Sequence, residues 1–367
     1  MRKIALAASM ITGTVVGAGI LGLPYTFYNS GFLLGCAMLM FSIITSLLLM
    51  IYISELDFNI KNIHQIPGLV RHALGKKAGF VQFIVFVLGT YGATTAYTIG
   101  VSKILNILFG ISAPELMLYY FLFCSALVFF GLKVVGKAEF ILSTIVISII
   151  LFLSAVVSAG VNPVNLSGFK TDNLMLSYGV ILFSCLGVNI IPEVNIYLRE
   201  DKRRVKLSII TAMVICFVIY FFFAYSFSGA FGSNIHDIAI DNLKGKLLIL
   251  GSVFACLSMT SAYLSLGLTL RDSFMQDYSI KSDLFATLFT TMPSLLIAIF
   301  MNPGFVNALS FTGAYVASIE GILIALAVLK QRKKYKMRLV KMGSFPLYMI
   351  MFVFSLVLLL KTYSLLM

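Results

Sequence analysis

The fold of this chain is decided by residues 13–24, which read GTVVGAGILGLP. These residues lie inside the first long apolar run, Ile4–Phe27, and include four glycines and one proline. Glycine loses much backbone entropy in a helix, and proline lacks the N–H donor that a helix needs. Within a bilayer, opened backbone is tolerated only where it lines a cavity, because the freed N–H and C=O groups need partners. The stretch therefore predicts a membrane helix that is interrupted beside a cavity.

A second interruption is predicted in the sixth apolar run, where residues 183–193 read FSCLGVNIIPE. Each break lies about a dozen residues into its run, which at roughly 1.5 Å per residue is near the middle of a bilayer. The two broken runs each open a group of five apolar runs, and groups of five have opposite topologies. Matching breaks in two such groups indicate an inverted-repeat transporter. For either break alone, close helix packing at glycine spacing remains the alternative interpretation.

Composition excludes most other classes of protein. Hydrophobic residues make up 60% of the 367 residues, charged residues make up 11%, and the mean hydropathy is +1.02. Soluble domains have about 45–50% apolar and about 25% charged residues. A soluble domain, a disordered chain, a coiled coil and a secreted disulfide scaffold are therefore excluded. The net charge of +13 does not indicate a nucleic-acid partner, since the basic residues lie mostly in short gaps between apolar runs.

The chain is predicted to be an all-α membrane protein with eleven transmembrane helices. Each run has about the 20 apolar residues that a spanning helix needs. The runs are Ile4–Phe27, Gly31–Leu56, Gly79–Phe109, Pro114–Gly131, Ala138–Gly160, Asn173–Tyr197, Val205–Phe231, Leu247–Phe274, Leu284–Met301, Phe305–Leu329 and Phe345–Leu366. We expect a single domain, 1–367, with a first five-helix repeat in 1–160, a second in 172–330 and an extra helix in 345–366.

Charge predicts the orientation of these helices in the cytoplasmic membrane. If the N-terminus is placed inside, 22 of the 27 Lys and Arg residues fall in the inner gaps. Cytoplasmic loops are enriched in Lys and Arg. We therefore expect a multi-pass protein with a cytoplasmic N-terminus and, given an odd number of spans, an external C-terminus.

The ends of the broken helices predict the kind of cargo. The half-helix that begins after Gly19 would present free N–H groups, which suit a carboxylate. The half-helix that ends near Val16 would present free carbonyls, which suit a cation or an ammonium group. One amino acid zwitterion satisfies both ends.

One site is predicted for a sodium ion as the coupling cation. The neighbouring hydroxyls of Thr260 and Ser261 would join the carbonyls of Gly13 and Val16 around a sodium ion, since hard cations prefer oxygen ligands. The alternative is that both hydroxyls bond back to their own helix. No other metal site and no cofactor are predicted.

Ionisable residues within apolar runs are functional candidates by default. Glu320 and Glu193 are the proton-coupling candidates, and Glu193 could instead pair with Arg199 at the inner interface. Lys103 lies near the outer end of its run and is expected to extend its ammonium group to the membrane surface.

Three segments resemble the amino acid/auxin permease family of the amino acid–polyamine–organocation superfamily. They are TGTVVGAGILGLPYTFYNSGF (12–32), IPEVNIYLREDKRRVKLSIITAMVICFVIYFFFAYSFSGAFG (191–232) and LSMTSAYLSLGLTLRD (257–272). The third is also similar to the hydroxy/aromatic amino acid permeases. The resemblance implies a leucine-transporter-like fold of five plus five helices with one helix added, and a site in which Gly17, Ala18 and Gly19 hold the substrate carboxylate.

The resemblance also implies the remaining site residues. It places the cation at Gly13, Val16, Thr260 and Ser261. It assigns the amino group and side chain of the substrate to the opened region of the sixth span. The further substrate-contacting residues are Thr14, Tyr91, Phe183, Ser184, Cys185 and Gly187.

The sequence therefore predicts a secondary active amino acid transporter, not an enzyme. It would import neutral or aromatic amino acids by alternating access, coupled to Na⁺ or H⁺. The alternative is a non-transporting nutrient receptor subunit on the same fold. The expected partners are the amino acid and the lipid bilayer, with no nucleic acid and no particular oligomeric state.

Overall fold

The computed structural model describes residues 2–60, 65–131, 137–170, 173–199, 201–277, 280–334, 339 and 343–366. These residues form helices and short connections, and no strand occurs among them. A helix satisfies its backbone hydrogen bonds within one segment, which is what an apolar chain in lipid requires. The all-α prediction is confirmed for the described part of the chain.

The α-helices follow the apolar runs of the sequence. They are α1 (Arg2–Val15), α2 (Leu23–Ser30), α3 (Phe32–Asn59), α4 (Ile66–Leu74), α5 (Lys76–Phe109), α6 (Ala113–Phe129), α7 (Lys137–Ser158), α8 (Leu174–Cys185), α9 (Ile191–Tyr197), α10 (Lys202–Phe231), α11 (Gly245–Asp277), α12 (Asp283–Leu296), α13 (Phe305–Phe311), α14 (Ser318–Lys334) and α15 (Phe345–Leu366). Short 3₁₀ segments are η1 (Ala18–Gly22), η2 (Pro163–Leu166), η3 (Val188–Ile190), η4 (Gly232–Asn234) and η5 (Ala239–Asn242). Two π-helical segments are η6 (Ile297–Met301) and η7 (Thr312–Ala317).

Eight helical stretches among the described residues are long and apolar enough to span a membrane. A ninth is possible if α1 and the η1–α2 segment, which are bent by 49°, form one broken span. Two shorter apolar helices, Ala113–Phe129 and Ser143–Ser158, lie where two more spans are expected. Every predicted run therefore contains helix, while the count of eleven spans remains a prediction.

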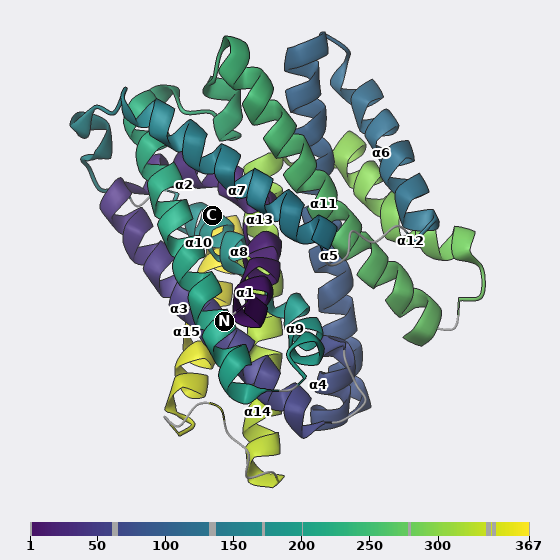
Figure 1. Ribbon diagram of the computed structural model, residues 1–367. Coiled ribbons are helices and arrows are strands. Elements are labelled where there is room, and N and C mark those ends of the chain that lie inside the picture. Colours follow the sequence, from purple (N-terminus) through teal and green to yellow (C-terminus); the bar gives the residue numbers. More distant parts are fainter. Residues whose placement is uncertain are drawn as a thin grey trace.

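The helices form one bundle in which the broken helices are central (Figure 1). Helices α1 and α8 lie near the middle of the view, with α10 packed against α1. Helices α6 and α12 pack together on one side, and α15 packs against α14. Helix α4 packs on α5 and α14 with Ile66, Leu69 and Val70 buried, so its apolar face contacts protein.

Proline positions explain several helix boundaries. Proline stands in the first turn of α2, α4, α6 and α9, where its missing N–H costs no hydrogen bond. Pro293 is different, because it lies inside α12 and is followed by the π-helical turn η6. Proline within a helix removes a backbone bond, which agrees with the local change of helix type.

Candidate functional site

Both predicted interruptions are present. Helix α1 ends at Val15, and the chain continues through the extended Gly17 (φ −89°, ψ −150°) into η1. Helix α8 ends at Cys185, and the chain continues through Gly187 (φ −159°) into η3 and α9. Glycine and proline at these positions therefore do open the helices, as the sequence predicts.

The two breaks touch each other through glycines. A Cβ atom on Gly19 in the first break would lie 2.5 Å from the Oγ of Ser184 and 2.8 Å from its Cα. A Cβ atom on Gly187 in the second break would lie 2.4 Å from a methyl carbon of Val15. Each break therefore contains one glycine that packs against a residue of the other broken helix. The contact requires residues without side chains, which gives these two glycines a packing role as well as an opening role.

A cavity of about 360 Å³ lies beside the two breaks. It is bordered by α1, η1, α8, η3, α9, α5, α7, α11, η7 and α14. Ligand pockets are commonly about 300–1,000 Å³ and bring a few polar groups together on largely apolar walls. This cavity has that size, and the backbone interruptions that follow α1 and α8 both border it.

The cavity extends towards one end of the bundle, the end at which α1 begins, called the N-terminal end below. Phe86, Tyr197, Thr269 and Glu320 line it in this direction. Towards the opposite end the side chains are closely packed, and Leu21, Phe27, Phe305, Ile238 and Ile240 are fully buried. The structure is therefore closed at the opposite end and hollow towards the N-terminal end.

Most predicted substrate residues line this cavity. They are Thr14, Gly17, Ala18, Gly19, Phe183, Ser184 and Gly187. Cys185 is fully buried and is not among the lining residues. Tyr91 is not among them either, because its hydroxyl donates a hydrogen bond to the Phe289 carbonyl of α12 at 2.6 Å. On the same helix as Tyr91, Tyr97 lines the cavity instead.

The predicted cation residues are only partly brought together. Gly13, Val16 and Ser261 line the cavity, but Thr260 does not. The Thr260 hydroxyl faces α6, where it accepts a hydrogen bond of 3.4 Å from Tyr120. Neighbouring hydroxyls on a helix point in directions about 100° apart, so Thr260 and Ser261 face different neighbours.

The cavity is also lined by hydroxyl groups that the sequence does not single out. Ser258 and Ser265 lie on the face of α11 that Ser261 occupies, at spacings of three and four residues. On α7, the Oγ of Ser143 lies 2.1 Å from where a Gly13 Cβ would be. Helical periodicity could have indicated the two α11 serines, whereas Ser143 depends on how α7 packs on α1.

Both acidic candidates line the cavity. Glu320, which follows the π-helical segment η7, is buried, and its Oε1 accepts a hydrogen bond of 3.0 Å from the Gln82 side chain of α5. Glu193 lies on α9 and is exposed. Thr312 and Val316 of η7 line the cavity as well, so the π-helical turn forms part of its wall. Such turns occur frequently at functional sites.

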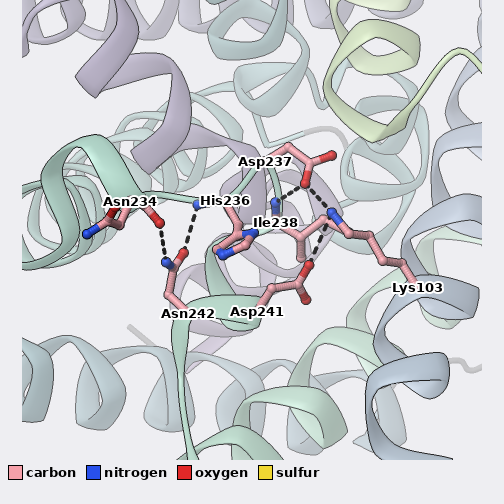
Figure 2. Close-up of polar contacts among 7 residues, drawn as sticks. All are labelled: Lys103, Asn234, His236, Asp237, Ile238, Asp241 and Asn242. Atoms are coloured by element: carbon pink, nitrogen blue, oxygen red, sulfur yellow. Dashed lines mark hydrogen bonds and ion pairs between the residues drawn. The ribbon is translucent and has the colours of Figure 1, made fainter. Parts of the chain in front are cut away.

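Three charged residues meet at the opposite end of the bundle (Figure 2). The Lys103 ammonium of α5 pairs with Asp237, and it lies 3.3 Å from the Oδ2 of Asp241. Burial raises the pKa of the Asp241 carboxyl, and the charge of Lys103 works against that rise. Lys103 therefore pairs with the segment between α10 and α11 rather than only reaching for the membrane surface as expected.

The segment that carries these carboxylates covers the closed end of the cavity. Its η5 turn packs against η1, α2 and α11. The side-chain amide of Asn242 stabilises the conformation of this segment (Figure 2). It accepts a hydrogen bond from the backbone N–H of His236 at 2.9 Å and donates one to the backbone carbonyl of Asn234 at 2.7 Å. The Lys103 pairs thus tie this cover to the long helix α5.

Comparison with known proteins places this geometry in a family. The chain is similar to the tyrosine-specific transport system 1 of Haemophilus influenzae, with 24% identity over 91% of this chain and 90% of that protein. It is also similar to glutamine transporter 2 of Aliivibrio fischeri, with 22% identity over 89% of each protein. Among solved structures it is similar to Mhp1 in an inward-facing conformation, with a TM-score of 0.67 and 13% identity over 90% of this chain and 77% of that chain.

The family model supports the resemblance suggested by the sequence motifs only in part. The model of the tryptophan/tyrosine permease family matches residues 1–361, nearly the whole chain. The resemblance to the amino acid/auxin permeases is not confirmed at the level of the family. Permease membership, two transporter relatives and the apolar helices agree that the chain is a membrane transporter rather than an enzyme. The chain belongs to the tryptophan/tyrosine permease family.

Proposed function

We propose that this permease is a cation-coupled secondary active transporter of neutral or aromatic amino acids. The observation that carries the proposal is that both interrupted helices border one cavity of about 360 Å³. The relatives named for tyrosine and glutamine transport support an amino acid cargo, since both of those amino acids are neutral.

The cavity offers main-chain groups for both charges of the cargo. At the start of η1, the N–H groups of Ala18 and Gly19 suit a carboxylate, because a helix start carries free donors and positive dipole. At the end of α8, carbonyl groups suit an ammonium. Phe183 and Tyr97 add aromatic surface for a side chain.

Alternating access would begin from the state seen here. With the N-terminus cytoplasmic and the C-terminus external, as the basic residues predict, the cavity extends inwards and the Lys103 cluster closes the outer end. We propose the five-plus-five inverted repeat, with α15 as the added eleventh span. The similarity to Mhp1 supports a shared overall fold, and the paired glycine contacts support pseudo-symmetric breaks.

We favour a proton as the coupling ion. Glu320 is a buried carboxyl beside the cavity, and a carboxyl can carry a proton through a transport cycle. Sodium is the second candidate, supported by Gly13, Val16 and Ser261, which all line the cavity. The orientation of Thr260 towards Tyr120 counts against the sodium site in its predicted form.

Uptake into proteoliposomes tests the proposal. Purified protein would be offered radiolabelled tyrosine, phenylalanine, tryptophan and glutamine under separate proton and sodium gradients. We expect at least one of these amino acids to accumulate with the proton gradient. Specific binding without uptake or counterflow would instead favour the receptor alternative, and the absence of both binding and uptake would reject the amino acid proposal.

A further inference from the structure

One buried hydroxyl contacts the ends of both broken helices. Tyr220 lies on α10 and is fully buried. Its hydroxyl oxygen is 2.7 Å from the carbonyl oxygen of Val15 and 2.6 Å from that of Ser184. Val15 is the last residue of α1, and Ser184 is the last but one of α8. A third helix therefore bridges the two carbonyl ends that the breaks create.

This hydroxyl has one hydrogen for two acceptors. A tyrosine O–H donates once, and a carbonyl oxygen only accepts. The Val15 carbonyl also accepts from the Gly17 N–H at 2.8 Å, so it keeps a partner when the hydroxyl donates to Ser184. The hydrogen can pass from one carbonyl to the other by rotation about the C–O bond, while the ring stays in place.

The oxygens are too close together for an ion to replace that hydrogen. Separations of 2.6 and 2.7 Å are those of O–H···O hydrogen bonds. A hard cation sits about 2.0–2.6 Å from each oxygen, so its ligands lie farther from one another than this. The three oxygens therefore form a hydrogen-bonded bridge rather than a cation site.

We propose that Tyr220 is a positioning residue that fixes the two main-chain ends of the cargo site relative to each other. The inference rests on the proposed function, because the cargo is what these ends would bind. Tyr220 does not line the cavity, so it acts through Val15 and Ser184, which do. These residues also form the reciprocal contacts with Gly187 and Gly19. Loss of the bridge would leave the binding groups less well ordered before the cargo arrives.

A series of side chains at position 220 tests the bridge by the number of hydrogens donated. Tyr220→Phe donates none, the native tyrosine donates one, and Tyr220→4-aminophenylalanine, introduced by stop-codon suppression, donates two. We expect Tyr220→Phe to raise the KM for uptake about tenfold, near the upper limit for the net effect of one hydrogen bond. The maximal rate per folded protein should change by less than about twofold, because the groups that bind the cargo remain present.

Tyr178→Phe is the matched control. Tyr178 lies on α8 and is buried, and within the described part of the chain its hydroxyl has no hydrogen-bond partner. Its removal should leave KM unchanged. 4-Aminophenylalanine at position 220 can serve both carbonyls, so its KM should equal the native value or fall below it.

Each outcome separates the inference from the proposed function. If the native protein transports and Tyr220→Phe leaves KM unchanged, the inference is overturned and the proposed function stands. If Tyr220→Phe does not fold, a KM raised about tenfold by the two-hydrogen 4-aminophenylalanine would overturn the inference, given the size of one hydrogen bond. If the native protein transports no amino acid, the proposed function fails and the inference fails with it.

Discussion

Single residues set how closely the two broken helices approach each other. Gly19 packs against both the side chain and the backbone Cα of Ser184. A larger residue at position 19 would fit only if the two broken helices moved apart. Gly187 lies on Val15 and Met50, whose side chains are buried. The absence of a side chain at these two positions therefore allows the two broken helices to pack closely against each other.

Gly19→Ala is expected to abolish uptake while the protein still folds. The added methyl group would lie 2.5 Å from Ser184 Oγ and 2.8 Å from its Cα, so the breaks must move apart. Overpacking of this kind costs about 1–3 kcal/mol. Gly160→Ala is the control, since its Cβ would meet only contacts of 3.6 Å or more. Uptake and thermal stability in detergent would be measured for both, and native uptake in Gly19→Ala would contradict the account.

Glu320→Gln is expected to uncouple transport from the proton gradient. The variant keeps the size of the side chain but cannot release or take up a proton. Net uptake should no longer respond to an imposed pH gradient, while exchange of internal for external amino acid should continue. Glu115→Gln removes an exposed carboxylate at the start of α6 and should change neither activity.

Sodium dependence would contradict that interpretation of Glu320. If uptake follows the sodium gradient, is unaffected by Glu320→Gln and is lost in Ser261→Ala, the coupling ion is sodium. Thr260→Ala is the matched control for Ser261→Ala, because Thr260 faces Tyr120 rather than the cavity.

At the scale of elements, the turn η5 and the helix α5 are joined by charge. Asp241 has a nearly fully buried side chain, 2% exposed, and Lys103 is the cation beside it. Removal of one partner of a buried pair is destabilising, because the remaining charge loses its compensation. The Lys103 side chain is 38% exposed, so solvent screens part of this effect.

Lys103→Gln is therefore expected to loosen the cover at the closed end of the cavity. Amide hydrogen exchange of residues 236–242 should become faster, which reports local opening of that segment. Lys244→Gln removes an exposed lysine near the same segment and should leave exchange unchanged. Equal protection in the native protein and in Lys103→Gln would show that the ion pairs do not hold the cover.

The sequence predicted those features that depend on local chemistry. Glycine and proline within residues 13–24 and 183–193 interrupt a helix whatever its tertiary contacts are. The positions of both breaks could therefore be predicted from the sequence. Lys103 could not be paired from the sequence, because its partners come from a segment more than 130 residues away. Tyr220 stands in an aromatic run, and only the packing of α10 on α1 brings its hydroxyl to the breaks.

The motifs predicted the broad class of protein better than its family. A glycine-rich first helix suits any transporter that binds cargo at opened backbone, so it does not distinguish closely related permeases. The local sequence pattern also could not predict which way the Thr260 and Tyr91 hydroxyls point. Each hydroxyl turns to a neighbouring helix, α6 or α12, whose position the sequence does not give.

At the scale of the whole molecule, the closed and hollow ends suggest one step of a transport cycle. The cavity extends towards the N-terminal end, and the η5 segment covers the other. In the proposed alternating-access cycle, these roles are exchanged in a second state. The Lys103 pairs would then break, and the main-chain ends at the two breaks would stay together through Tyr220.

The most direct test of this account is the structure of the protein with a transported amino acid bound. We expect the carboxylate of the amino acid to lie within hydrogen-bond distance of the Ala18 or Gly19 N–H, and its ammonium group to lie near the carbonyl end of α8. An amino acid bound away from both breaks, or bound with the breaks closed into continuous helices, would contradict it.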